Sequence, residues 1–225
     1  MSALLPKPEA IVFDFDGTIA DTRSLIVSCF RKTFAALSIT APQERLIAAT
    51  IGLPLETAFA RLTGLGGIES LAAADRYREI FRSLDLPEVE PIAGMDALVR
   101  RLAAAGVPLA VASSRDHDTL DPMLSSLGLF DLFATVIDSD DAGREKPEPD
   151  MLFLAAERLA VPPGRLVMIG DTSFDIEMGH NAGAWTIGVT WGNHSREEIE
   201  AAKPTIIVTE ADQIASAVGL PTARR

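Results

Sequence analysis

Short apolar runs recur along the chain, and segments with helical periodicity separate most of them. The runs are continuous rather than alternating between apolar and polar positions, which is typical of strands covered on both faces. Segments 94–106 and 150–160 carry apolar residues at the spacing of amphipathic helices. This alternation predicts an α/β fold with a doubly wound, Rossmann-like parallel sheet as its core. The predicted strands are 10–15, 108–114, 134–139, 165–171, 184–190 and 205–210.

The stretch between the first and second predicted strands breaks this rhythm. It holds no convincing strand pattern, and its helical patterns cover 21–37, 42–50, 54–63 and 69–84. A crossover between parallel strands needs only one helix, so the excess predicts a small all-helical cap domain inserted after the first strand. The predicted division is 1–21 and 89–225 for the α/β core and 22–88 for the helical cap.

Polar residues gather where the predicted strands end. Ligands of open α/β sheets bind beyond the carboxyl ends of the strands, so these residues are the candidates for a functional site. The first strand leads to Asp14 and Asp16, the second to Ser113, Ser114 and Arg115, the loop after the third to Lys146, and the fourth to Asp171 and Asp175.

The carboxylates at this edge favour a metal ion. Asp14 and Asp16 interrupt an apolar run, and a buried carboxylate is costly unless it is paired, hydrogen-bonded or bound to a metal. Asp14, Asp16 and Asp171 would repel one another and protonate unless a cation lay among them. Oxygen ligands without His or Cys are suited to Mg²⁺, which is the predicted cofactor.

Ser113 and Lys146 predict an anion-binding site next to the metal. The Ser113 hydroxyl and the free N–H groups of a helix starting near Asp116 can bind an anion, and Lys146 adds a positive charge. Such a convergence stabilises a phosphoryl group during transfer. One carboxylate in line can attack phosphorus, while a second protonates the leaving group and then activates water.

Four segments, in order, resemble the motifs of the haloacid dehalogenase superfamily: "DFDGTIADT", "VASSR", "REKPEPDMLF" and "GDTSFDIEMGHNAGA". The resemblance spans nearly the whole chain, and the helical insertion is similar to the helical cap of that superfamily. The cap loop "TIGLPLE" and the segment "WGNHSREEI" resemble the phosphoglycolate phosphatase-like members. The expected activity is therefore that of a phosphoric monoester hydrolase.

The resemblance implies a role for each matching residue. Asp14 is the expected nucleophile and Asp16 the expected general acid and base. Ser113 and Lys146 are expected on the transferred phosphoryl group, and the expected phosphate- or substrate-binding set is completed by Ser114, Arg115, Gly17 and Thr18. The expected Mg²⁺ ligands are the Asp14 carboxylate, the Asp16 carbonyl and Asp171, with Asp175 bonding to or supporting the metal.

The predicted reaction is Mg²⁺-dependent hydrolysis of a small organophosphate through an aspartyl phosphate, with 2-phosphoglycolate as the first candidate substrate. Pyrophosphatase, sugar-phosphate phosphatase and β-phosphoglucomutase-like phosphomutase activities remain as alternatives. Asp16 argues against a dehalogenase, and the cap loop 50–56 holds no lysine for phosphonate cleavage. A receiver-like signalling module is a hypothesis of another class; it needs neither Asp16 nor a cap.

The composition of the chain limits the kinds of binding partner that are expected. A formal charge of −12 opposes general nucleic-acid binding, so the predicted partner is a small phosphorylated metabolite, with the protein a monomer or a homodimer. No apolar run is long enough to span a bilayer, and the first residues lack the pattern of a signal peptide. A cytoplasmic location is therefore expected. The three histidines, His117, His180 and His194, are predicted to lie at the surface.

Overall fold

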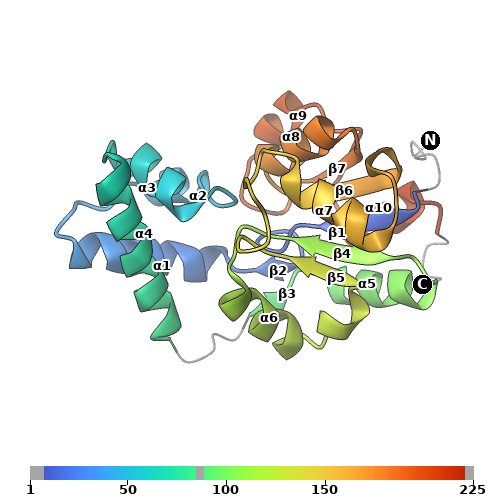
Figure 1. Cartoon of the computed structure of the whole chain (residues 1–225), viewed down its shortest axis with the longest axis horizontal. Coiled ribbons are helices and arrows are strands. Elements are labelled where there is room, and N and C mark those ends of the chain that lie inside the picture. Colours follow the sequence, from blue (N-terminus) through green and yellow to red (C-terminus); the bar gives the residue numbers. More distant parts are fainter. Residues whose placement is uncertain (1–7, 85–88, 221–225) are drawn as a thin grey trace.

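A six-stranded parallel sheet forms the centre of the computed structural model, which describes residues 8–84 and 89–220. The strand order is β5-β4-β1-β6-β7-β8, and every neighbouring pair is parallel (Figure 1). This order confirms the predicted doubly wound α/β core. The strands are β1 (Ala10–Phe13), β4 (Leu109–Ala112), β5 (Thr135–Ile137), β6 (Leu166–Gly170), β7 (Trp185–Val189) and β8 (Ile206–Val208).

Helices cover both faces of the sheet, which is why its strands are continuously apolar. Ile11 and Phe13 of β1 face one hydrophobic cluster, and Ala10 and Val12 face the other. The first cluster is closed by α5 (Met95–Ala104), α6 (His117–Ser126) and α10 (Ala211–Ala217), and the second by α7 (Asp150–Leu159) and α8 (Ser173–Ala182). A further helix, α9 (Arg196–Ala201), follows β7, and short 3-10 turns lie at Phe130–Leu132 and Pro163–Arg165.

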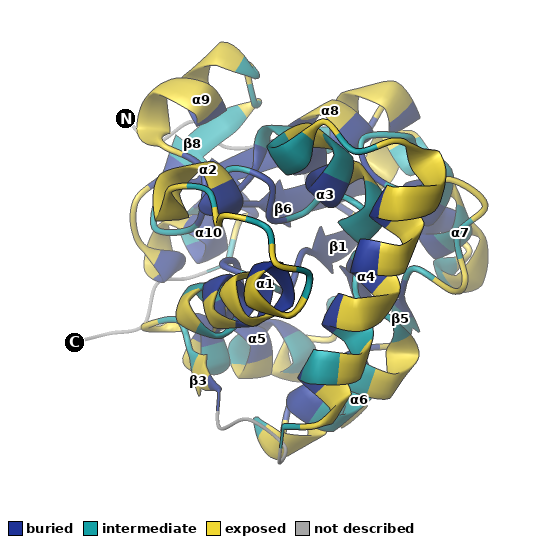
Figure 2. Ribbon diagram, turned by 90° about the vertical axis from the view of Figure 1, so that its left-hand side faces the viewer, coloured by how far each residue is buried: buried dark blue, intermediate teal, exposed yellow. Residues whose placement is uncertain are grey.

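Four helices lie beside the sheet, beyond the carboxyl ends of its strands (Figure 1). They are α1 (Arg23–Ala36), α2 (Glu44–Ala48), α3 (Leu55–Thr63) and α4 (Gly67–Arg82). Their buried faces turn toward one another, with exposed residues outside (Figure 2). Phe30 packs against Phe59 and Tyr77 with ring centroids 4.8 and 5.0 Å apart. We call these four helices and their loops the cap. α1, α2 and α3 lie within the segments 21–37, 42–50 and 54–63 expected from the sequence, and α4 begins two residues before the expected segment 69–84.

A short antiparallel ribbon joins the cap to the sheet. It pairs β2 (Ala20–Asp21), where the chain leaves the core, with β3 (Glu90–Pro91), where the chain returns. The hydrophobic pattern did not predict this ribbon, because two residues on each side are too few to show a period. The expected end of the insertion, 85–88, lies outside the described residues.

The strands are shorter than the apolar runs that predicted them, and the difference matters for the site. β4 ends at Ala112, so Ser113 and Ser114 lie in the following loop rather than in the strand. β6 likewise ends at Gly170, immediately before Asp171. Of the helices in the described part of the chain, none combines the length and apolar character required to cross a membrane.

Candidate active site

The polar residues that follow the strands meet at one edge of the sheet. Asp14 follows β1, and Asp171 follows β6, which lies next to β1. Ser113 follows β4 on the other side of β1. Because the three strands are parallel neighbours, their carboxyl ends carry these side chains to the same place. All three side chains are buried.

Lys146 reaches this edge from the loop between β5 and α7. Its side chain is fully buried, and its Nζ donates hydrogen bonds to Oδ1 of Asp14 at 2.6 Å and Oδ1 of Asp175 at 2.7 Å. Burial alone lowers the pKa of an ammonium group, but the two carboxylates reverse this and raise the pKa of Lys146 above its ordinary value. Lys146 is therefore a constant positive charge beside Asp14.

Asp14, Asp171 and Asp175 form an acidic cluster with ligand oxygens within 4.8 Å of one another. Burial raises the pKa of Asp14 well above its ordinary value, against the opposing effect of Lys146. Burial and the nearby Asp175 raise the pKa of Asp171 to about 7. Three ionised carboxylates and one ammonium leave an excess of two negative charges. This charge and the all-oxygen donor set fit a divalent metal ion.

Asn193, in the loop after β7, holds two of the expected metal ligands in place. Its backbone N–H and its Nδ2 donate to Oδ2 of Asp171 at 2.6 and 3.0 Å, and Nδ2 also donates to the Asp16 carbonyl at 3.2 Å. The Thr18 hydroxyl donates to the other oxygen of Asp171 at 2.8 Å. These bonds fix the orientation of the Asp171 carboxylate. The sequence analysis missed Asn193, although its position just beyond a predicted strand was a usable signal.

Gly17 is required where Asn193 and Asp171 approach the loop after β1. Its φ is +84°, and a Cβ there would lie 2.4 Å from Asn193 Nδ2 and 2.5 Å from Asp171 Oδ2. Both the backbone conformation and the space exclude a larger residue. Gly17 therefore shapes the loop, and Thr18 binds the Asp171 carboxylate through its hydroxyl. The expected contact of Gly17 and Thr18 with phosphate stays a prediction.

Replacing Asn193 by Ala is expected to weaken metal binding about 10- to 100-fold, the usual cost of losing a partner of a metal ligand. The Asp171 carboxylate loses one of its side-chain donors and becomes free to rotate. Titration calorimetry with Mg²⁺ on the folded protein measures this directly. Ser195→Ala, which removes a helix N-cap two residues away, is the control. An unchanged affinity in Asn193→Ala would contradict this role.

The Asp16 carboxylate lies outside the acidic cluster and pairs with Arg115. Arg115 Nε donates to Oδ1 and Oδ2 of Asp16 at 2.9 and 2.7 Å, and Nη2 donates to Oδ1 at 2.7 Å. The Thr22 hydroxyl donates to Oδ1 as well. The guanidinium lies 5.0 Å from the centre of the Phe81 ring in the cap. Arg115 was predicted to bind substrate; its guanidinium faces Asp16 in this structure, and the substrate contact stays a prediction.

The residues after β4 contact the cap as well as the core. The Ser114 hydroxyl donates to the Gly52 carbonyl in the cap loop at 2.9 Å. The Ser113 Oγ accepts a weaker bond from the Arg115 N–H at 3.3 Å. The N-terminus of α6, expected to bind an anion, is partly satisfied by its own N-cap, because Asp116 accepts from the Thr119 N–H.

The prediction that His194 lies at the surface is wrong. The residue is 6% exposed, and its ring contacts Phe174 edge to face. Its Nδ1 accepts from the Ser173 N–H at 3.0 Å, so Nε2 carries the proton and points to the Ala49 carbonyl of the cap at 3.4 Å. Local polarity gave no sign of this burial, because the cap that covers the ring is distant in sequence.

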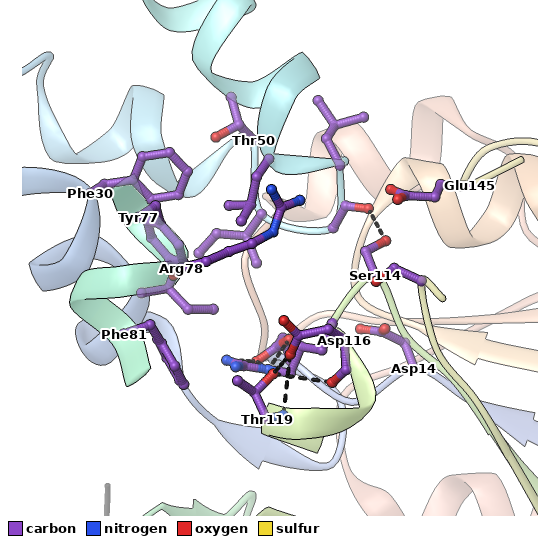
Figure 3. Close-up of a pocket in the computed structure, with 18 of the residues that line it drawn as sticks. Asp14, Phe30, Thr50, Tyr77, Arg78, Phe81, Ser114, Asp116, Thr119 and Glu145 are labelled. Atoms are coloured by element: carbon purple, nitrogen blue, oxygen red, sulfur yellow. Dashed lines mark hydrogen bonds and ion pairs between the residues drawn. The ribbon is translucent and has the colours of Figure 1, made fainter. Parts of the chain in front are cut away.

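A cavity of about 90 Å³ lies between the cap and the carboxyl edge of the sheet. Asp14, Asp16 and Ser114 line it from the core, while Arg78 and Tyr77 line it from α4 (Figure 3). The cavity is mixed in character, with the apolar side chains contributed mainly by the cap. Asp14, which lies in the acidic cluster, therefore faces a partly open cavity lined by both the cap and the core.

The family profile described as "Haloacid dehalogenase-like hydrolase" matches residues 11–189. The chain belongs to this family. The match runs from β1 through β7 and so includes the cap and every residue of the site described above except Asn193 and His194. It confirms the family expected from the four motifs.

Known relatives match the sequence of this hydrolase over nearly their full lengths. "Probable phosphatase IndB" of Dickeya dadantii is 36% identical over 211 residues, 92% of each chain. "Phosphoglycolate phosphatase" of Pectobacterium atrosepticum is 28% identical and covers 96% of this chain and 95% of its own. The structure of a haloacid dehalogenase-like family hydrolase from Streptococcus pneumoniae superposes with a TM-score of 0.82 at 25% identity, covering 92% of this chain and 96% of that one. The chain is thus a phosphatase-type hydrolase of this family.

Proposed function

We propose that the protein is a Mg²⁺-dependent phosphatase that hydrolyses a small phosphate monoester through a phosphoaspartate on Asp14. The observation that carries the proposal is the position of Asp14. It lies against the Lys146 ammonium at 2.6 Å, within the acidic cluster, and lines the cavity beneath the cap. A nucleophilic carboxylate needs this combination of a neighbouring cation and an enclosed space for the substrate.

In the first step, an oxygen of Asp14 attacks phosphorus and the bond to the leaving-group oxygen breaks. Asp16, which lines the same cavity, donates a proton to that oxygen and releases an alcohol. Since both Asp16 oxygens accept bonds from Arg115, this pair must loosen before Asp16 can reach the leaving group.

In the second step, Asp16 accepts a proton from water, whose oxygen attacks phosphorus. The phosphorus–Asp14 bond breaks, which frees inorganic phosphate and restores the carboxylate. Lys146 offsets negative charge beside Asp14 in both steps, and the proposed role of Ser113, which follows β4, is to donate its hydroxyl to a phosphoryl oxygen.

A Mg²⁺ ion held by Asp14, Asp171 and the Asp16 carbonyl, with Asp175 in support, would neutralise phosphoryl charge. We propose that Asp175 supports the metal ligands rather than binding the metal itself. One of its oxygens accepts from Lys146, and the other accepts from the Thr172 N–H and hydroxyl at 3.0 and 2.7 Å. Both Asp175 oxygens are thus engaged within the described protein.

We assign residues 22–88 as a cap domain that closes over the substrate, with 1–21 and 89–225 as the core. The contacts that join the cap to the core near the site include Ser114 to Gly52, Arg82 to Asp116 at 2.9 Å, and Arg115 over Phe81. Closure of this kind excludes water from the first step. The cavity between the cap and the core is small, about 90 Å³, which supports a small metabolite with a compact leaving group as the proposed substrate.

Phosphate release measured across a panel of esters, with and without Mg²⁺, tests this function. The panel contains 2-phosphoglycolate, the substrate named for one relative, together with pyrophosphate, sugar phosphates and p-nitrophenyl phosphate. Release that requires Mg²⁺ and stops with EDTA is the expected result. No release from any ester by folded, Mg²⁺-binding protein would reject the phosphatase proposal.

A further inference from the structure

Glu145 places an unsatisfied carboxylate at the wall of the cavity. The residue precedes Lys146 in the loop after β5, and its carboxylate is directed toward the cavity, above Ser114 and Asp14 (Figure 3). Its Oε2 is buried and accepts no hydrogen bond from the described residues. A buried acceptor without a donor is unfavourable, and a ligand that brings a donor removes that cost.

The charges around Glu145 favour a ligand group that donates a hydrogen bond over an acidic ligand group. Burial and the nearby Glu56 raise the pKa of Glu145 to about 7, against the opposing effects of Arg78 and Lys146. Neither cation forms an ion pair with Glu145 in the described structure, since Arg78 bonds to Glu56 at 2.7 Å and Lys146 to Asp14. The carboxylate therefore lacks the partner that a hydroxyl or an ammonium group would provide.

The arginines that line the cavity are all occupied by carboxylates of the protein. The pairs within the described residues are Arg78 with Glu56 at 2.7 Å, Arg82 with Asp116 at 2.9 Å and Arg115 with Asp16 at 2.7 Å. A second acidic group on the substrate would have to break one of these pairs and would also face Glu145. The leaving-group side of the cavity is thus matched poorly to a carboxylate.

We infer that Glu145 is a specificity-determining residue that accepts a hydrogen bond from a hydroxyl or ammonium group on the leaving group. This inference rests on the proposed phosphatase function, which places the phosphoryl group at Asp14. The preferred substrates are then phosphate monoesters of compact polyols or amino alcohols, and the acidic 2-phosphoglycolate is disfavoured. A hydroxyl and an ammonium group can both donate a hydrogen bond to Glu145. A set of esters that differ only in this group shows which of the two is preferred.

The test compares kcat/KM for glycerol 1-phosphate, phosphoethanolamine, ethyl phosphate and 2-phosphoglycolate, with p-nitrophenyl phosphate as the general substrate. The wild-type protein is expected to favour the hydroxyl or the ammonium ester at least about tenfold over the other two small esters. Glu145→Gln keeps the side-chain volume and removes the charge. It is expected to lose about tenfold or more on the favoured ester, mainly through KM, and to gain on 2-phosphoglycolate.

Glu148→Gln is the matched control, because Glu148 is in the same loop but pairs with Arg144 at the surface. Its ester preferences are expected to equal those of the wild type. A wild-type preference for 2-phosphoglycolate over both donor esters would overturn the inference without any variant. Unchanged ratios in Glu145→Gln that still hydrolyses p-nitrophenyl phosphate would overturn it as well. No hydrolysis of any ester, p-nitrophenyl phosphate included, would reject the phosphatase function and this inference with it.

Discussion

Asp14→Asn is expected to lower kcat by about 10⁴-fold or more, because the amide cannot form the covalent phosphoryl intermediate. The fold should survive the change. The Asn oxygen can still accept from Lys146, and one of three mutually repelling buried charges is removed. We therefore expect the free energy of unfolding to change by less than about 1 kcal/mol.

Steady-state phosphate release and urea unfolding of the same preparations measure both effects. Asp131→Asn, at an exposed position in the turn Phe130–Leu132, is the matched control and should retain full activity. Wild-type turnover by a folded Asp14→Asn protein would refute the nucleophile. Loss of activity together with loss of the fold would instead indicate a structural role.

Lys146→Met is expected to destabilise the metal-free protein by about 3–5 kcal/mol at neutral pH, since it leaves Asp14 and Asp175 buried without their shared cation. Breaking a buried pair costs more than its formation gains, because the remaining charges cannot be solvated. The expected loss of stability is thus much larger than the change expected for Asp14→Asn, although each substitution removes one charge from the same site.

The destabilisation should depend on pH. Without Lys146, the folded-state pKa of Asp14, already raised by burial, rises further above that of the unfolded chain. The folded form then binds more protons than the unfolded form above the unfolded pKa, so stability falls as pH rises through this window. Urea unfolding in EDTA at pH 5.5 and pH 8 should show the larger loss at pH 8. Lys32→Met, an exposed change on α1, should show little loss at either pH.

Asp14→Asn and Lys146→Met both test the balance of charge between the buried carboxylates and Lys146. Burial raises the pKa of Asp14 and of Asp171, and Lys146 compensates only part of the negative charge of the three carboxylates. A divalent cation bound below the cavity would offset the remaining negative charge and favour the ionised form of these carboxylates. The cap then encloses this charge, and its contacts run through Ser114 and Arg115, which follow the strand next to Asp14.

The amino-acid sequence by itself determined the α/β architecture and the placement of Asp14, Asp171 and Lys146 at one edge of its sheet, but not that the Asp16 carboxylate lies outside the acidic cluster. Each of the six predicted strands contains an observed one, because a continuous apolar run reflects burial on both faces and can be recognised locally. Asp14, Asp171 and Lys146 were predicted for a similar reason. The parallel order of the strands brings their carboxyl ends together. Asp14 and Asp171 lie near the ends of predicted strands, and Lys146 lies in the loop after one.

Only the tertiary structure decided which partner each polar group finds. The Arg115–Asp16 pair joins positions 99 residues apart, and Asn193, in the loop after β7, contacts both Asp171 and the Asp16 carbonyl. The burial of His194 and the unpaired oxygen of Glu145 depend on how the cap lies against the core. Such partners depend on packing between distant segments, whereas hydrophobic periodicity depends on near neighbours along the chain.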